Sequence, residues 1–146
     1  MTLSASARGR FVAVASLALL PWTIVYTRGF VTVFTAVALV DPLTGHVTTV
    51  GEYLSYTVGR PPELMVPWLV GIVVFALAAV SAALAFVDRE DERVTGFLLV
   101  LLGVTQLSVA VGFSGRPTYV AVPVATVAAW ALAWVVYRPA LARMVR

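Results

Sequence analysis

Four long apolar runs dominate the pattern along this 146-residue chain; short polar stretches separate the last three, and residues 28–63 separate the first two. The runs contain no charged residue and occupy residues 11–27, 64–87, 94–113 and 118–137. A helix rises about 1.5 Å per residue and needs about 20 apolar residues to cross a bilayer. The pattern therefore predicts four transmembrane helices with these bounds, although the first run, at 17 residues, is short.

The first run has a second interpretation, because Arg8 and Arg10 precede it as the basic residues of a signal peptide would. A signal peptide ends in a small-residue cleavage site, whereas this run ends with Pro21, Trp22 and Tyr26. The sequence therefore favours an anchor that is retained.

The second and third runs are separated only by the six charged residues DREDER, at positions 88–93. Charge is costly to bury in hydrocarbon, so this stretch predicts a tight hairpin whose turn stays in water. Asp91 and Glu92 would then lie at the start of the third helix, where the helix dipole favours acids.

Residues 28–63 form the extracellular segment of this threading. Its part FVTVFTAVALV, residues 30–40, is too short to cross, and three placements stay open: it extends the first helix, re-enters the membrane or lies against the bundle. Thr49 and Glu52 have capping-box spacing, and Gly59 and Pro61 would stop a helix. This pattern predicts a short helix on the outer membrane surface or, alternatively, a cap packed over the bundle.

Composition supports a membrane protein, because the chain is 61% hydrophobic and only 12% charged, against about 25% charged in ordinary soluble domains. Seven arginines fall on the side of both termini and three on the other, which predicts cytoplasmic termini in a multi-pass protein of the cell membrane. The net charge of +3 is modest and lies mostly at the two ends of the chain. This distribution indicates membrane topology rather than a nucleic-acid-binding surface, so we expect the lipid bilayer and no nucleic acid as a partner. The expected fold is one all-α domain, residues 1–146: an integral membrane bundle of four helices with a short outer-surface helix.

The sequence contains no catalytic, cofactor or metal signature. It has no Cys, and the lone His46 does not stand in ligand spacing with Asp41 or Glu52. No ionisable residue falls inside the four runs, which argues against proton coupling and intramembrane hydrolysis. We therefore expect no catalytic site, no cofactor and no metal.

Small and polar residues at regular spacing are the candidates for helix packing, because small residues let helix backbones approach closely in membranes. Gln106 would hydrogen-bond between helices, or alternatively line a solute pathway with Thr105 and Ser108. The full set of packing candidates is Gln106, Gly96, Gly103, Ala110, Ala121, Ala125, Ala129 and Ala133.

Three stretches resemble a group of small haloarchaeal membrane proteins with four predicted helices and no assigned activity. They are YTVGRPP at 56–62, DREDERVTGFLLVLLG at 88–103 and YVAVPVATVAAWALAW at 119–134. Some members are encoded near an HtrA-type protease, so the resemblance implies a link to envelope quality control. It supplies no functional residues.

Two functions from different classes are consistent with these observations. The first is a non-enzymatic interaction protein or accessory subunit that binds another envelope membrane protein. The second is a small-solute transporter or ligand-binding membrane subunit, which would depend on Gln106 and its polar neighbours.

Overall fold

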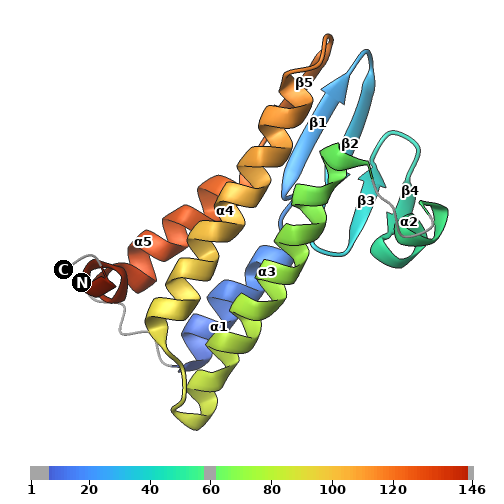
Figure 1. Ribbon diagram of the computed structural model, residues 1–146. Helices are drawn as coiled ribbons and strands as arrows, with labels where there is room; N and C mark the ends of the chain where they lie inside the picture. Colours follow the sequence, from blue (N-terminus) through green and yellow to red (C-terminus); the bar gives the residue numbers. More distant parts are fainter. Residues whose placement is uncertain (1–6, 58–61, 145–146) are drawn as a thin grey trace.

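The computed structural model describes residues 7–57 and 62–144 and combines a helix bundle with a β-sheet at one end (Figure 1). The helices are α1 (Ala7–Ser16), α2 (Val50–Tyr56), α3 (Val66–Ala83), α4 (Glu92–Ser114) and α5 (Val124–Met144), with 3-10 turns η1 (Leu17–Leu19), η2 (Glu63–Met65) and η3 (Leu84–Val87). The strands are β1 (Thr23–Thr27), β2 (Phe30–Phe34), β3 (Ala38–Asp41), β4 (His46–Thr49) and β5 (Tyr119–Val122).

The prediction of an all-α bundle of four transmembrane helices is wrong, because the strands form one five-stranded antiparallel sheet in the order β4-β3-β2-β1-β5. The fold is α+β. The β1–β2 hairpin turns at Arg28 and Gly29, which both have positive φ, as a two-residue type I′ hairpin requires.

The first apolar run, residues 11–27, was expected to be one helix and is instead a helix followed by a strand. Helix α1 ends at Ser16, η1 follows, and Leu20 is extended before Pro21. A residue before proline is driven out of the helical region, and proline cannot donate the next helical hydrogen bond. The β-branched sequence TIVYT, residues 23–27, then continues as β1.

The last run, residues 118–137, divides in the same way. Its first part forms β5, Pro123 follows, and α5 begins only at Val124. Proline lacks the N–H that a strand would need but is tolerated where a helix begins. Helix α5 then extends past the predicted end to Met144, with Pro139 inside it.

In the segment 28–63, residues 30–40 form β2 and most of β3. Of the three expected placements they take the third, against the bundle, but as strands rather than as helix, with Phe34 packed on α3 and α4. The predicted helix start is present: Thr49 Oγ1 accepts the N–H of Glu52 at 3.2 Å and caps α2. The predicted stop at Gly59 and Pro61 lies outside the described residues.

The two middle runs form helices close to their predicted bounds. Within residues 7–57 and 62–144, three helical segments are long and apolar enough to cross a membrane: Glu63–Val87, Glu92–Ser114 and Val124–Arg143. Three such helices, rather than four, are therefore present in the described chain.

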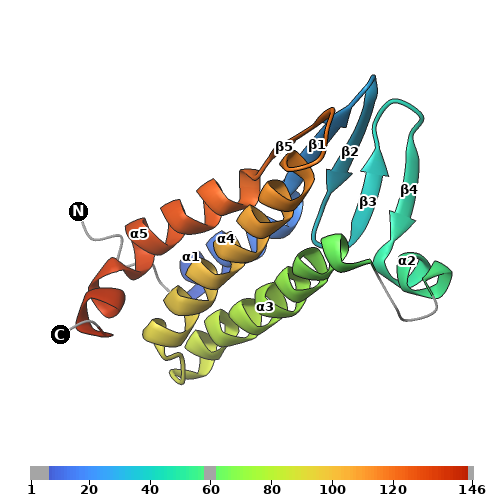
Figure 2. The same cartoon turned by 45° about the horizontal axis from the view of Figure 1, so that its top comes forward.

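The helices α3, α4 and α5 run side by side, and α1 lies along part of α3 (Figures 1 and 2). We call "helical end" the end that holds the start of α1, the connection 88–91 and the last turns of α5. We call "sheet end" the opposite end, with the turns at 28–29, 42–45 and 115–118. The chain thus travels four times between these ends, twice partly as strand.

One face of the sheet packs on α3 and α4. The Phe34 ring makes edge contacts with Trp68 of α3 and Phe113 of α4, both with ring centroids 5.6 Å apart. The indole N–H of Trp68 donates to the Thr35 carbonyl at 2.9 Å. These aromatic contacts fix the sheet against the helices, with the other face turned away from them.

Candidate functional site

The most highly connected polar group is the carboxylate of Glu90, in the connection between α3 and α4. Asp88, in the left-handed conformation at φ 56°, ends η3, and the chain then returns toward α4. This turn directs Glu90 into the helices, where its side chain is only 2% exposed. The expectation that the whole charged run stays in water is therefore wrong for Glu90.

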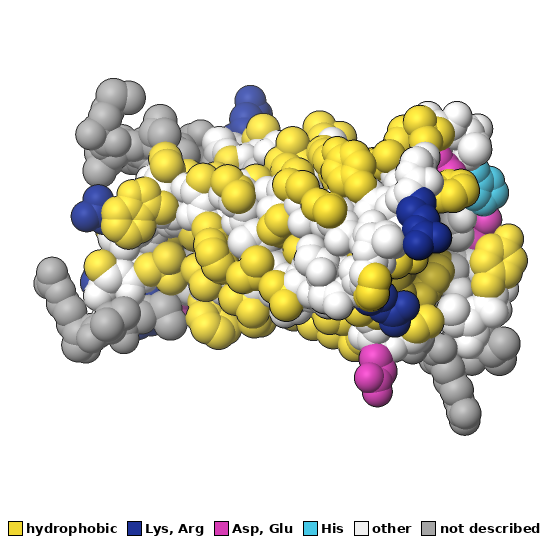
Figure 3. All heavy atoms as spheres, turned by 90° about the horizontal axis from the view of Figure 1, so that it is seen from above, with side chains coloured by type: hydrophobic (Ala, Val, Ile, Leu, Met, Phe, Trp, Pro, Cys, Tyr) yellow, Lys and Arg dark blue, Asp and Glu magenta, His cyan; other side chains and the backbone are white. Residues whose placement is uncertain are grey.

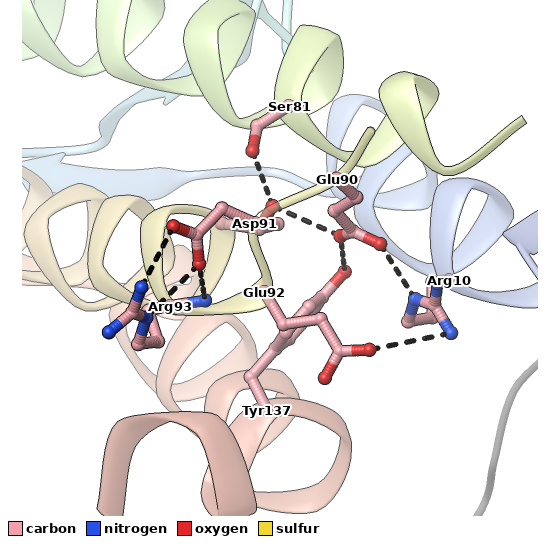
Figure 4. A network of polar contacts seen from close by, with 8 residues as sticks. Arg10, Ser81, Glu90, Asp91, Glu92, Arg93 and Tyr137 are labelled. Carbon is pink, nitrogen blue, oxygen red and sulfur yellow. Dashed lines mark hydrogen bonds and ion pairs between the residues drawn. The ribbon is translucent and has the colours of Figure 1, made fainter. Parts of the chain in front are cut away.

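Three elements donate to this one carboxylate (Figure 4). Arg10 Nε of α1 donates to Oε2 at 2.9 Å. Thr95 Oγ1 of α4 and Tyr137 Oη of α5 donate to Oε1 at 3.0 and 3.1 Å. Ser81 of α3 adds the fourth helix, since its hydroxyl lies 2.5 Å from that of Thr95. We call these five residues the end cluster.

The charges in the end cluster balance one another. Burial lowers the pKa of Arg10, but the hydrogen bond and charge of Glu90, together with the charge of Glu92, outweigh it and raise the pKa above its ordinary value. Glu92 is the more distant partner, with Oε1 3.8 Å from Arg10 Nη1. The guanidinium therefore remains charged and serves as the fixed counter-ion of a buried carboxylate.

The rest of the charged run is exposed and begins α4. Asp91 Oδ1 accepts the backbone N–H of Arg93 at 3.0 Å and its Nε at 3.3 Å, and these bonds lower the pKa of Asp91. The prediction that acids stand at the start of this helix is confirmed, with Asp91 as the capping residue and Glu92 in the first turn. A cleft of about 570 Å³ opens beside them toward Arg143.

A second cluster lies between the ends of the bundle, around the fully buried Gln106. Thr23 Oγ1 of β1 donates to Gln106 Oε1 at 3.1 Å, and Gln106 Nε2 donates to Thr105 Oγ1 at 3.4 Å. Gly71 of α3 lies against both, since a Cβ there would come within 2.8 Å of Thr105 Oγ1. We call Thr23, Gly71, Thr105 and Gln106 the central cluster; it joins β1, α3 and α4.

Other packing candidates lie where α4 meets α5. Gly103 makes room for Trp130, whose indole N–H donates to the Val100 carbonyl at 2.9 Å. A Cβ on Gly96 would come within 3.0 Å of Tyr137 Cβ. Ala110 of α4 is buried, and so are Ala125, Ala129 and Ala133 of α5.

Ala121 is the exception among the packing candidates, because it lies in β5 rather than in a helix and is half-buried. The four-residue spacing that relates it to Ala125 is therefore not a helical spacing.

Asp41 and Glu52, two of the three side chains weighed as metal ligands, make local hydrogen bonds instead. Asp41 Oδ1 accepts the N–H groups of Leu43 and Thr44 in the β3–β4 turn, at 3.0 and 3.3 Å. Glu52 contributes to the cap of α2, with its Oε1 3.3 Å from Thr49 Oγ1. In the described part of the chain, no three His, Cys, Asp or Glu side chains are grouped so as to hold a metal ion.

The profile of one protein family, described as Domain of unknown function (DUF8050), matches residues 2–146. The chain belongs to this family. The DUF8050 match covers the residues of the sheet, the helices and both clusters. No curated protein and no solved structure matches the chain significantly.

The buried polar groups of the DUF8050 chain are hydrogen-bonded within the protein. Among the described residues, every buried side-chain nitrogen or oxygen has a hydrogen-bond partner. The sequence pointed to Gln106 but missed Glu90, whose partners Arg10 and Tyr137 are 80 and 47 residues away in sequence. The signal was present as polar residues near the ends of the apolar runs.

Proposed function

We propose that this protein is a non-enzymatic, multi-pass protein of the cell membrane that serves as an accessory subunit for another envelope membrane protein. The membrane part of this proposal is supported by the exposed side chains of the long helices. In Figure 3, apolar side chains cover the middle of the molecule, whereas charged ones gather toward its two ends. Large exposed apolar side chains include Val73, Leu77 and Val80 of α3, Phe97, Val104 and Val111 of α4, and Val127, Trp134 and Val135 of α5.

An apolar surface of this extent is unfavourable in water but suits hydrocarbon. The resemblance to haloarchaeal membrane proteins supports the same location. Six described arginines belong to the helical end and two, Arg28 and Arg116, to the sheet end. By the positive-inside rule this asymmetry favours a cytoplasmic helical end, with both termini on that side.

The interaction role is carried by one observation, the exposed apolar side chains in the turns of the sheet end. Phe30 is 66% exposed beside the β1–β2 turn, and Leu43 is 65% exposed in the β3–β4 turn. Both turns lie at the same end of the sheet (Figure 1). Burying each of these side chains against a partner would contribute roughly 1.5–3 kcal/mol.

Transport of a small solute has weaker support, because the residues that would form the pathway are occupied. Gln106 is fully buried and bonded to Thr23 and Thr105. Ser108 donates to the Val104 carbonyl of its own helix at 3.0 Å. These contacts favour a packing role for the polar residues of α4.

Photo-crosslinking in native membranes tests the interaction role. A photoreactive amino acid at Phe30 or Leu43 should yield protein adducts of one common mass, and Phe30→Asp should weaken the adduct formed from position 43. Val104, exposed on α4, is the matched control and should give no such adduct. Unmodified monomer from both turn positions would overturn the proposal.

The orientation has its own test, because the chain has no Cys. Single cysteines at His46 and Arg143 can be labelled in whole cells with a membrane-impermeant reagent. We expect labelling at position 46 only, and labelling at both or only at 143 would reject this threading.

A further inference from the structure

The sheet has an unusual second face. Its side chains follow from the strand registers, which pair Ile24 with Val33 and Val122, and Tyr26 with Val31 and Val120. Paired residues share a face, and these lie on the face opposite to the buried Val25 and Phe34. We call this the outer sheet face: Ile24, Tyr26, Val31, Val33, Ala38, Val40, Val47, Thr49, Val120 and Val122.

An antiparallel sheet with one face on a core usually presents polar side chains on the other. The outer sheet face instead has no charged residue, and its polar atoms are the hydroxyl of Tyr26 and, on the edge strand β4, the hydroxyl of Thr49, which caps α2. The most accessible side chains of this face are Val120, Val47, Tyr26 and Val122, which are 59%, 48%, 45% and 44% exposed, and Ile24 is half-buried. Accessible valines on a face of this kind call for an apolar surrounding.

The depth of the sheet follows from the central cluster. Thr23, the first residue of β1, is hydrogen-bonded to Gln106, which lies eight residues before the end of α4 at Ser114. Eight residues of helix correspond to about 12 Å. The start of β1 therefore lies about 12 Å below the sheet end of a helix long enough to cross a membrane.

Side-chain chemistry changes along β1 and β5 in step with this depth. Ile24 and Val122 are deepest, and Tyr26 follows nearer the sheet end. Thr27 and Thr118 then meet with their hydroxyls 3.3 Å apart, and Arg28 and Arg116 lie at the turns. An order of apolar, aromatic, polar and cationic groups is the order found across a membrane interface.

The β5 edge of the sheet is closed in a way that water would not require. On the side away from β1, the N–H of Ala121 donates to Ser114 Oγ at 3.2 Å. The N–H of Tyr119 donates to the Arg116 carbonyl at 3.3 Å. Pro117 and Pro123, which flank the strand, have no N–H. In hydrocarbon an unbonded N–H costs several kcal/mol, whereas in water it would be solvated.

We propose that the outer sheet face is a lipid-contacting surface, with Ile24 and Val122 among the acyl chains of the outer leaflet and Tyr26 at the headgroups. The inference rests on the membrane location in the proposed function. Hydrocarbon fits better than a protein strand, because a strand that paired with β5 would need free N–H groups at that edge. β1 and β5 thus replace the outer halves of two membrane helices.

Spin labels on single cysteines in the protein reconstituted into phospholipid vesicles test this assignment. Accessibility to oxygen, which concentrates in lipid, is compared with accessibility to a water-soluble nickel chelate. Val122 and Val120 probe the outer sheet face. Val104 on α4 is the lipid reference and Leu43 in the β3–β4 turn is the water reference. We expect an oxygen-to-nickel ratio at 122 close to that at 104 and several-fold above that at 43, with 120 between them.

The outcomes separate the two proposals. A ratio at 122 and 120 equal to that at 43, with lipid values at 104, would overturn the lipid-contacting sheet and leave the membrane location intact. Low accessibility to both reagents at 122 and 120 would show that protein covers the face, and would also overturn the inference. Water-like values at 104 would reject the membrane location itself. Two label positions on one face guard against local misfolding at either.

Discussion

The two buried polar clusters both attach the N-terminal part of the chain to the long helices, but with different chemical groups. Each fastens the first part of the chain to the helices behind it: Arg10 of α1 is held by Glu90, and Thr23 of β1 by Gln106. The end cluster uses a full ion pair, whereas the central cluster uses only hydroxyl and amide groups. The chain between these anchors, residues 11–22, is the larger part of the run 11–27 that was expected to be one helix.

Depth in the proposed membrane accounts for the difference. The end cluster lies at the helical end, where Arg10 keeps 19% of its side chain exposed and Glu92 supplies a second carboxylate. Charges near a boundary keep part of their hydration, but at the centre of a bilayer each costs several kcal/mol. Hydrogen bonds between neutral side chains avoid that cost, but each stabilises the fold less than an ion pair does. The comparison predicts that breaking the ion pair of the end cluster costs more than any change to the central cluster.

The largest effect is expected from Glu90→Ala. The substitution removes the carboxylate and leaves Arg10, Thr95 and Tyr137 without their shared acceptor. Removing one partner of a buried ion pair costs about 3–5 kcal/mol of stability. Because Arg10 is partly exposed, we expect a loss at the lower end of this range, about 3 kcal/mol. The measurement is the free energy of unfolding in mixed micelles, by titration with a denaturing detergent.

Glu92→Ala is the matched control, because Glu92 pairs with the same arginine at 3.8 Å and its side chain is 40% exposed. Its loss should cost less than about 1 kcal/mol, as for other surface pairs. Equal losses for the two variants would mean that burial of Glu90 does not set the strength of the end cluster.

Sequence patterns predicted the helical middle of the molecule and failed at its flanks. Uncharged runs are the main signal for a membrane helix, and they locate α3 and α4. The runs at 11–27 and 118–137 are equally apolar, but Pro21 and Pro123 divide them, and their β-branched halves pair with each other as β1 and β5. Pairing between strands more than 90 residues apart leaves no local pattern to read.

The sequence indicated the central cluster but not the end cluster. An isolated glutamine in an apolar helix stands out, so Gln106 could be selected as a packing residue. Glu90 could not, because it stands among five other charged residues and its burial depends on Arg10 and Tyr137 from other helices. Composition reveals a misplaced polar residue more readily than a buried residue within a polar stretch.

Gly71→Ala should give the next largest effect, about 2 kcal/mol of destabilisation. The new Cβ would come within 2.8 Å of Thr105 Oγ1 and would also contact the Gln106 amide, so α3 and α4 would have to separate. Gly51→Ala in α2 is the same chemical change in open space, with the nearest atom 4.0 Å away. It should be neutral or stabilise by up to about 1 kcal/mol, because alanine favours helix. Unfolding titrations that give the two variants the same sign would contradict the close approach.

Tyr137→Phe removes one donor from Glu90 and leaves the ring in place. A hydrogen bond to a charged group contributes about 1.5–3 kcal/mol. Because Glu90 keeps its other donors, we expect the variant to lose about 1.5 kcal/mol of stability, the lower end of this range. Tyr56→Phe, at a side chain that is 73% exposed, should leave the melting temperature in detergent unchanged. If both variants melt like the wild type, the Tyr137 hydroxyl does not contribute to the end cluster.

The smallest effect measures the central cluster directly, through a double-mutant cycle of Thr23→Val and Gln106→Leu. Their hydrogen bond, 3.1 Å long, should give a coupling energy of about 0.6 kcal/mol, the average for such pairs within membranes, and below about 2 kcal/mol. The reference cycle combines Gln106→Leu with Thr32→Val, on the same sheet face in β2, and should show no coupling. A coupling for Thr23 and Gln106 above that measured for Arg10 and Glu90 would reverse the ranking, because dipoles in the centre would then anchor β1 more firmly than charge anchors α1.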